Sequence, residues 1–419
     1  MKPDKISVFE YDRLKVGAEY GGVLFTKALH EALERFHANG NTRYFKLISN
    51  GIEFCEYVGV IQVDGLQIEI LPKLDRSPGD LATWRDILIG MLREVGFFLV
   101  SAPSFGMLNL KANSILELYF QLFITEVEYL VHTGLIKQYR RQALNHTALK
   151  GSLDFPRHLV KNLIHKERFY TRSSVYDHDH VWHRILSQCI NLIRLLSQNT
   201  HIHNRIGALE LSFPEVSGQR ICDASFRKLV YSRKTEAYRT AIGIARLLLL
   251  NFHPELAAGG NSVLALMFDM NLLWESFVYQ SLRKECLIHS APYLVRAQRS
   301  ADFWSSGLCR RYLRPDIFIE NPEDGRRYVL DTKWKDLSGS GPSASDLQQL
   351  FAYSQFFRSA RNALVYPGRK HCVQGGNYAI SAPWAESISC SLIRLGLGSS
   401  IRQWQREIYQ TVMEWMEVD

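Results

Sequence analysis

The spacing of apolar residues changes twice along this chain, and this change limits the folds the chain can adopt. Residues 1–75 combine one stretch of helical spacing with several strand stretches, residues 81–255 show mainly helical spacing, and residues 261–419 mix both. At 419 residues the chain exceeds one ordinary domain. The sequence therefore predicts an α+β multidomain protein with a small α+β N-terminal domain, a helical middle and a C-terminal mixed α/β domain.

The N-terminal domain is predicted from one helix and two turn signals. Apolar residues from Leu24 to Phe36 recur at three- and four-residue intervals, which predicts an amphipathic helix. Strand segments follow over residues 43–49, 52–63 and 66–71, separated by Asn50-Gly51 and Asp64-Gly65. These dipeptides favour tight hairpin turns, so the three strands are predicted to form a meander.

The middle region is predicted to be a helical body between two linkers. Helical spacing is clear over residues 115–132, 181–197 and 232–252. Proline and glycine mark residues 75–80 and 253–260 as the linkers.

Composition narrows the class of protein. The chain has 50 Lys and Arg against 42 Asp and Glu residues, a net charge of +8 that suits a polyanionic partner. Its seven cysteines form no C-x-x-C pair, so neither a disulfide framework nor a zinc ribbon is predicted. No apolar run approaches the length of a membrane span. We therefore expect a cytoplasmic protein with no membrane contact.

A hairpin in the last region brings charged residues together. Residues 314–320 and 327–334 have strand patterns, and residues 321–325 form the turn between them. A turn centred near residue 323 places Asp316 opposite about residues 330–332. Asp331 and Lys333 are two residues apart on one strand, so they share a face. Two carboxylates and one ammonium group should therefore converge.

This trio has the chemistry that metal-assisted phosphodiester hydrolysis requires. Carboxylate oxygens are suitable ligands for Mg²⁺, for which Mn²⁺ can substitute, and we expect them from Asp316 and Asp331. The backbone carbonyl of Thr332 could add a further oxygen ligand. Lys333 would orient or deprotonate the attacking water and balance charge developing on the phosphate.

Predicted helices flank the hairpin on both sides. The helix over residues 267–284 carries Glu275, an outer metal ligand or base, and the helix over residues 346–357 carries Gln349 and Tyr353 on one face. These two would contact the DNA backbone or support the site. A [DE]-x-K tripeptide alone occurs by chance on the order of twice in such a chain. A surface ion pair therefore stays an alternative for the hairpin, as a solvated helix face does for Glu275, Gln349 and Tyr353.

The residues in this order resemble a known nuclease core. Pro315-Asp316, then Asp331-Thr332-Lys333, then Gln349-x-x-x-Tyr353 is similar to the PD-(D/E)xK pattern of restriction-endonuclease-like domains. The whole chain more specifically resembles the McrC family of McrBC-type modification-dependent restriction systems. Three further segments carry this resemblance: residues 59–74 with the ending Glu69-Ile70-Leu71-Pro72-Lys73, residues 150–155, and residues 268–277.

The resemblance implies a subunit that does not act alone. It implies a Mg²⁺-dependent endonuclease that cleaves modified double-stranded DNA in phage defence, assembled with a McrB-like AAA+ GTPase hexamer whose hydrolysis it stimulates through its N-terminal region. The chain has no G-x-x-x-x-G-K-[ST] loop, so the motor would be a separate chain. Two alternatives stay open: a non-catalytic nuclease-fold adaptor that positions a partner NTPase on DNA, and a nuclease of this fold in an unrelated complex.

Other clusters have weaker signals. Asp177-His178-Asp179-His180-x-x-His183 contains potential metal ligands, but helix capping and packing are favoured there. His201 and His203 fall in a predicted loop, where packing is again favoured. Basic clusters at Arg140-Arg141, Arg157 to Arg172 and Arg310-Arg311 could bind phosphates or form solvated basic faces.

Overall fold

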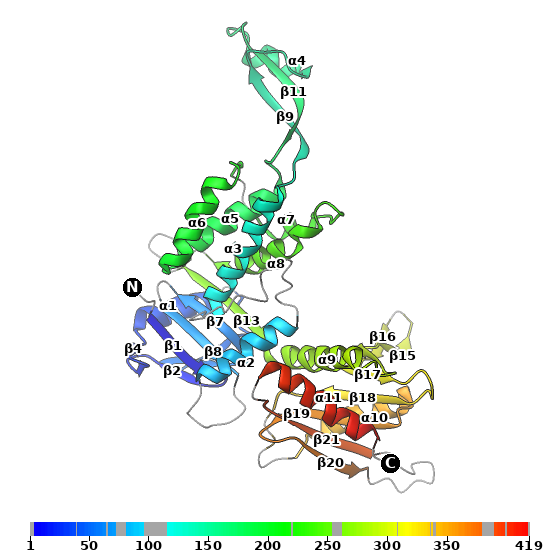
Figure 1. The fold of residues 1–419 in the computed structure, drawn as a ribbon. Coiled ribbons are helices and arrows are strands. Elements are labelled where there is room, and N and C mark those ends of the chain that lie inside the picture. The colour runs from blue at the N-terminus through cyan, green and yellow to red at the C-terminus, as the bar shows by residue number, and fades with distance from the viewer. Residues whose placement is uncertain are drawn as a thin grey trace. The chain divides into compact units, whose positions relative to one another are not determined.

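The computed structural model has a mixed α/β fold with several sheets (Figure 1). It describes residues 4–38, 40–63, 66–72, 81–95, 115–218, 221–253, 262–307, 309–335, 337, 341–378, 389–398 and 400–417. The chain forms two compact units, each built from several segments. The first comprises Met1–Asp4, Gln62–Gln67 and Leu99–Leu266; the second comprises Lys5–Ile61, Ile68–Phe98 and Met267–Asp419. The three-part division along the sequence stays a prediction.

The N-terminal segment of the second unit confirms the predicted helix but not the predicted meander. Helix α1 (Lys27–Ala38) buries Ala32, Leu33 and Phe36. The strands that precede and follow this helix are β1 (Asp4–Phe9), β2 (Arg13–Lys15), β3 (Glu19–Tyr20), β4 (Val23–Leu24), β5 (Phe45–Ile48), β6 (Gly51–Phe54), β7 (Tyr57–Val63) and β8 (Leu66–Leu71).

The meander is wrong because residues 52–63 form two strands rather than one. Strand β6 pairs with β2 and β5 in a three-stranded sheet, whereas β7 pairs with β8 in another sheet. Between β6 and β7 the backbone makes bonds outside either ladder. The Phe54 amide donates to the Asp12 carbonyl and the Cys55 amide to the Tyr44 carbonyl. The turn Asp64-Gly65 and the linker 75–80 lie outside the described residues.

The first unit contains a set of packed helices. They are α3 (Ile115–Thr133), α5 (Val181–Leu196), α6 (Thr200–Ser212), α7 (Asp223–Arg227), the short 3₁₀ helix η2 (Glu236–Tyr238) and α8 (Arg239–Leu250). Helices α3 and α5 confirm the predictions. The long helix over residues 232–252 is wrong, because a turn in which the Ser232 amide donates to Thr235 Oγ1 precedes α8. His201 and His203 lie in α6 rather than in a loop, since Asn199 caps that helix.

A β-ribbon interrupts the region that was predicted to be helical. Strands β9 (Gln138–His146) and β11 (Phe169–Asp177) pair antiparallel along their whole length, with β10 (Ser152–Leu153) and helix α4 (Phe155–Lys161) at the far end. Within the first unit this ribbon projects away from the helices (Figure 1). The prediction failed because β9 shows no regular alternation of buried and exposed residues. Beyond α8, strand β12 (Phe252–His253) pairs with β13 (Val263–Asp269).

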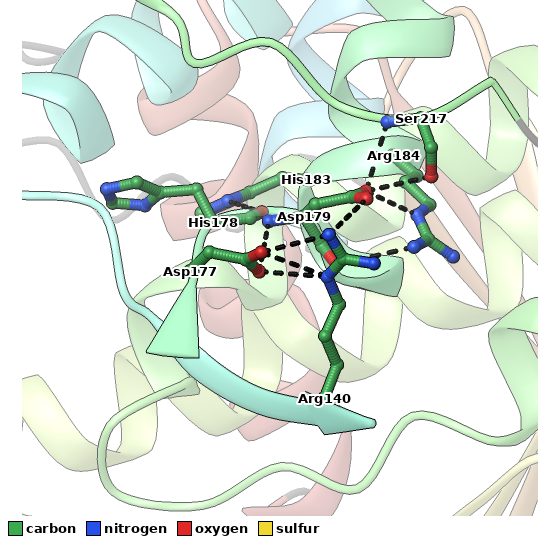
Figure 2. A network of polar contacts seen from close by, with 7 residues as sticks. All are labelled: Arg140, Asp177, His178, Asp179, His183, Arg184 and Ser217. Atoms are coloured by element: carbon green, nitrogen blue, oxygen red, sulfur yellow. Dashed lines mark hydrogen bonds and ion pairs between the residues drawn. The ribbon is translucent and has the colours of Figure 1, made fainter. Parts of the chain in front are cut away.

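Ion pairs hold the base of the ribbon, where the sequence offered a possible metal cluster. Arg140 lies 3.0 Å from Asp177 and 3.3 Å from Asp179. Asp179 also accepts from Arg184 and from the Ser217 backbone and hydroxyl, as Figure 2 shows. These donors, Arg184 first, hold the pKa of Asp179 far below its usual range. The acidic residues here therefore pair with cations of the chain, and no three His, Cys, Asp or Glu side chains in the described part form a metal site.

His183, in the same region, is fully buried and makes stabilising bonds with both ring nitrogens. One nitrogen, Nδ1, lies 2.8 Å from the His178 carbonyl, so it carries the proton, and Nε2 accepts from the Tyr238 hydroxyl at 3.0 Å. Burial, followed by the neighbouring His180, lowers the pKa of His183 to about 3.

Lowering the pH should therefore reduce the unfolding free energy of the first unit, because the folded chain holds His183 neutral. Below pH about 6.5 the unfolded chain binds a proton at this residue while the folded chain does not, so stability is lost as pH falls. Between pH 7 and 5 the wild type should lose about 2 kcal/mol more unfolding free energy than His183→Gln. Urea melts at both pH values measure this difference. The exposed His201→Gln variant should keep the wild-type pH dependence; the same dependence in His183→Gln would contradict the assignment.

A six-stranded sheet forms the core of the C-terminal part of the second unit. Its order is β14 (Leu294–Ala297), β17 (Ile317–Glu320), β18 (Arg327–Thr332), β19 (Arg361–Gly368), β21 (Ser389–Gly396) and β20 (Cys372–Asn377). Strands β17 and β18 are the predicted antiparallel hairpin, and β18, β19 and β21 run parallel. A separate two-stranded ribbon, β15 (Ala301–Ser306) and β16 (Cys309–Leu313), lies in the chain between β14 and β17.

Helices cover both faces of this sheet. On one face α10 (Ala344–Phe357) packs Leu350 and Tyr353 against Val329. On the other face Tyr328 contacts Trp415 of α11 (Ile401–Glu417), since neighbouring strand residues point to opposite faces. Helix α9 (Met270–Ile288) packs on α11, and α2 (Leu81–Glu94) joins it through the Lys284–Glu94 ion pair. Helix α9 begins later than predicted because residues 263–269 form β13, and Asp269 caps the helix.

All seven cysteines are free thiols, and four of them are buried. None of the helices described is long and apolar enough to cross a membrane.

Candidate active site

The hairpin register places the two aspartates side by side. The pairs run from Ile317↔Leu330 to Glu320↔Arg327, so the residue numbers of each pair sum to 647. This confirms the predicted register, in which Asp316 faces residues 330–332. The Asp316 Oδ2 atom accepts from the Thr332 amide at 2.7 Å and from the Thr332 hydroxyl at 2.8 Å. Asp316 is thereby fixed at the end of β18.

Asp331 is a buried carboxylate with only one of its oxygens in an ion pair. It is 1% exposed, and its Oδ2 lies 2.6 Å from Lys333 Nζ, as expected for residues that share a strand face. Its Oδ1 has no hydrogen-bond partner among the described residues. A buried carboxylate oxygen without a partner is costly, and such oxygens are found where a cation or reactant binds.

Burial and charge both act on the Asp331–Lys333 pair. Burial, followed by the charge of Asp316, raises the pKa of Asp331 against the opposing effect of Lys333. Burial is the largest single effect on Lys333 and lowers its pKa. The charge of Asp331, its hydrogen bond to Lys333 and the charges of Asp316 and Asp346 together outweigh burial and raise that pKa. Lys333 therefore stays protonated at neutral pH. It is suited to orient water and balance negative charge rather than to accept a proton.

Glu275 of α9 joins the site through a contact that the sequence did not reveal. Its Oε1 accepts from the side-chain Nε2 of Gln298 at 2.7 Å. The backbone amide of Gln298 donates to the backbone carbonyl of Asp316 at 2.9 Å. Burial, followed by the charge of Asp316, raises the pKa of Glu275 to about 7. Glu275 is thus close enough to Asp316 and Asp331 for their negative charges to raise its pKa. Gln298 has a left-handed backbone (φ +47°), which no local pattern signals.

The raised pKa of Glu275 has a measurable consequence for stability. Above pH about 4.5 the unfolded chain loses this proton while the folded chain keeps it up to about pH 7, so stability falls as pH rises through this window. Glu275→Gln removes this effect and keeps the Gln298 bond. Allowing for partial exposure, we expect the variant to melt roughly 2 °C above wild type at pH 8 and equally at pH 4.5. Thermal melts in EDTA at both pH values test this; equal melting temperatures at pH 8 would contradict it.

Gln349 and Tyr353 support the hairpin from α10. Gln349 Nε2 donates to the Tyr353 hydroxyl at 2.6 Å, and that hydroxyl donates to the Arg314 carbonyl at 3.0 Å. Tyr353 is only 2% exposed, and burial raises its pKa to about 12. Of the two roles open from the sequence, these contacts fit support of the strand that leads to Asp316.

The sequence patterns did not predict two further contacts near the site. Asp346 of α10 is buried and lies 3.6 Å from Lys335, and its charge acts on both Asp331 and Lys333. Trp334 follows the Asp-x-Lys segment directly, and its indole donates to buried Glu10 at 2.7 Å. The residues in the Trp334–Glu10 bond are 324 positions apart. No spacing rule could have paired them.

The donors at the site fit a small divalent cation. Two carboxylates converge, and the Thr332 backbone lies beside both. One of the carboxylates has a buried oxygen with no partner in the part of the chain that the structure describes. The described residues include no cluster of three His, Cys, Asp or Glu ligands, so only part of a coordination shell would come from side chains. That is usual for Mg²⁺, which keeps several waters.

Comparison with known proteins assigns the chain to a family. Residues 52–367 match the family described as "McrBC 5-methylcytosine restriction system component", and the chain belongs to that family. This match agrees with the resemblance to McrBC-type restriction systems that the sequence motifs indicated. No curated protein has a matching sequence.

Two solved structures from Thermococcus gammatolerans share the fold. The first is a half-complex from a tetradecameric assembly of McrB AAA+ hexamers with bound McrC: TM-score 0.72, 17% identity, covering 98% of this chain and 100% of the matched chain. The second is the McrBC complex: TM-score 0.50, 19% identity, covering 67% and 87%.

Proposed function

We propose that this chain is the endonuclease subunit of a McrBC-type restriction system. It hydrolyses phosphodiester bonds of double-stranded, modified DNA in a Mg²⁺-dependent reaction at the site of Asp316, Asp331 and Lys333. The observation that carries the proposal is the Asp331–Lys333 ion pair of 2.6 Å beside Asp316. The second Asp331 oxygen is buried and has no hydrogen-bond partner among the described residues.

The order of elements around the site supports a PD-(D/E)xK nuclease core. Helix α9 brings Glu275, the β17–β18 hairpin brings both aspartates and the lysine, and α10 brings Gln349 and Tyr353 before the parallel strand β19. A solvated surface ion pair is a poor explanation for this arrangement, since Asp331 is buried.

Each residue has a defined task in this proposal. Asp316 and Asp331 hold Mg²⁺ together with the Thr332 carbonyl. Bound Mg²⁺ would polarise the phosphate and favour formation of hydroxide from water. Lys333 orients the attacking water and offsets charge that develops on the phosphate oxygens. Glu275, whose pKa is raised to about 7 in the metal-free chain by burial and then by the charge of Asp316, is placed to exchange a proton with water at the edge of the site. Gln349 and Tyr353 hold the hairpin in place.

The proposed partner is a McrB-like AAA+ GTPase hexamer. The solved structures of similar fold support this, because one is a half-complex of McrB AAA+ hexamers with bound McrC and the other is a McrBC complex. The chain has no phosphate-binding G-x-x-x-x-G-K-[ST] loop, so it depends on a separate chain for nucleotide hydrolysis. Its N-terminal region would engage the ring and stimulate hydrolysis.

The test reconstitutes the chain with the GTPase of the same system. The complex, methylated plasmid, GTP and Mg²⁺ or Mn²⁺ should yield double-strand breaks, and EDTA or omission of either protein should prevent them. Intact plasmid with both proteins and either metal would reject the proposal.

A further inference from the structure

The β15–β16 ribbon is an exposed element attached directly to the candidate site. Nearly all its described residues are exposed, in contrast to the buried strands β17 and β18. Strand β16 ends at Leu313, and only Arg314 and Pro315 separate it from Asp316. The ribbon is thus tied to one of the two proposed metal ligands.

The ribbon carries arginine and an aromatic residue on each face. Trp304 pairs with Arg311 across the strands, so their side chains share one face. Arg310 and Tyr312 are two residues apart and share the opposite face. Trp304 is 52% exposed and Tyr312 is 56% exposed. Aromatic residues and arginine are enriched at binding interfaces relative to the rest of a protein surface.

Arg310 and Arg311 of the ribbon make no polar side-chain contact with the described residues. Both are exposed, and the structure gives neither guanidinium an ion pair or hydrogen bond with any residue in the described ranges. Over residues 294–307 and 309–314 the only carboxylate is Asp302, against five arginines: Arg296, Arg299, Arg310, Arg311 and Arg314. The segment is therefore strongly positive beside a site that is acidic.

The ribbon is anchored rather than loose at its base. Ala301 and Leu313 pack against the apolar core under α10, and the Phe303 ring meets Phe356 of α10 at 5.1 Å. Gln298 precedes the ribbon and binds both Glu275 and the Asp316 backbone. Because both ends are fixed to the site, anything bound along the ribbon is held in register with it.

We propose that the β15–β16 ribbon binds in a groove of duplex DNA next to the phosphate to be cleaved. This inference rests on the proposed nuclease function and adds the element that positions its substrate. A two-stranded ribbon has the size that the major groove admits. Arg310 and Arg311 bind phosphates on either side, and Trp304 and Tyr312 pack on sugars and base edges.

Binding assays with a charge-deleted ribbon test this directly. The full chain carries Asp331→Asn so that the labelled duplex stays intact. Adding Arg310→Ala and Arg311→Ala should raise the Kd about tenfold at physiological salt and reduce the slope of log Kd against log salt by about 1.8. The matched control, Arg402→Ala with Arg406→Ala, removes two exposed arginines from α11 on the other side of the sheet. It should change the Kd less than about twofold.

An exposed thiol gives a second readout that needs no substitution. Cys309 lies in the ribbon, and Cys372, also exposed, lies in β20 at the far edge of the sheet. Duplex DNA should slow N-ethylmaleimide modification of Cys309 several-fold and leave Cys372 unchanged, as measured by mass spectrometry. Equal rates at Cys309 with and without DNA, or an unchanged Kd in the ribbon variant, would overturn the inference.

The two proposals can fail separately. Ribbon-dependent DNA binding by a complex that never cuts DNA would reject the nuclease and keep the ribbon. Cleavage that requires Asp331, together with wild-type DNA binding after loss of both arginines, would reject the ribbon and keep the nuclease.

Discussion

Replacing Asp331 with alanine is expected to reduce DNA cleavage by the reconstituted complex roughly a thousandfold or more. The side chain supplies one of the two carboxylates that converge at the hairpin, and its Oδ1 is buried with no partner among the described residues. Single-turnover cleavage of labelled DNA measures the loss. Asp331→Asn keeps the shape of the side chain and should lose as much activity, which separates lost chemistry from lost folding.

Asp324 is the matched control for this substitution. It lies in the turn of the same hairpin, with its side chain 44% exposed and paired with Arg326. Asp324→Ala should cleave DNA at close to the wild-type rate. Wild-type cleavage by Asp331→Asn would contradict the assignment. If both Asp331 variants lose cleavage but still stimulate the GTPase normally, the adaptor role exists beside the nuclease role rather than instead of it.

Replacing Lys333 with methionine is expected to slow cleavage roughly a hundredfold or more. Methionine keeps much of the side-chain bulk and removes the charge that lies 2.6 Å from Asp331. Loss of this charge should also raise the pKa of Asp331 further, because Lys333 lowers it in the wild type. The variant should therefore recover activity partly at higher pH, where Asp331 is ionised again.

The control for Lys333 is Lys370→Met, which removes an exposed lysine from the same unit. Its cleavage rate and pH profile should match those of wild type. A pH–rate profile for each variant makes the measurement. If Lys333→Met kept the wild-type rate and profile, the lysine would have no role in water positioning or charge balance.

The hairpin could be predicted because its signals are local. Residues 321–325 favour a turn, the flanking stretches are apolar, and period-two alternation then fixes which residues meet. The observed register agrees with that reasoning, and so does the 2.6 Å contact between Asp331 and Lys333. The helices carrying Glu275, Gln349 and Tyr353 were predicted for the same reason, apart from the late start of α9.

The remaining contacts depend on chain segments far apart in sequence. Gln298 reaches Glu275 across 23 residues, and Trp334 reaches Glu10 across 324. Such pairs follow from tertiary packing, which periodicity does not encode. The same limit explains the missed β9–β11 ribbon. Its strand β9 lacks the regular alternation by which a half-buried strand is recognised.

The most direct test of the proposed metal site is calorimetric titration of Mn²⁺ into the full chain with a non-cleavable duplex present. Wild type should bind Mn²⁺, Asp331→Ala should show no binding at this site, and Asp324→Ala should bind as wild type does. Mn²⁺ binding that is unchanged in Asp331→Ala, or absent from wild type even with the GTPase added, would contradict the assignment of this site.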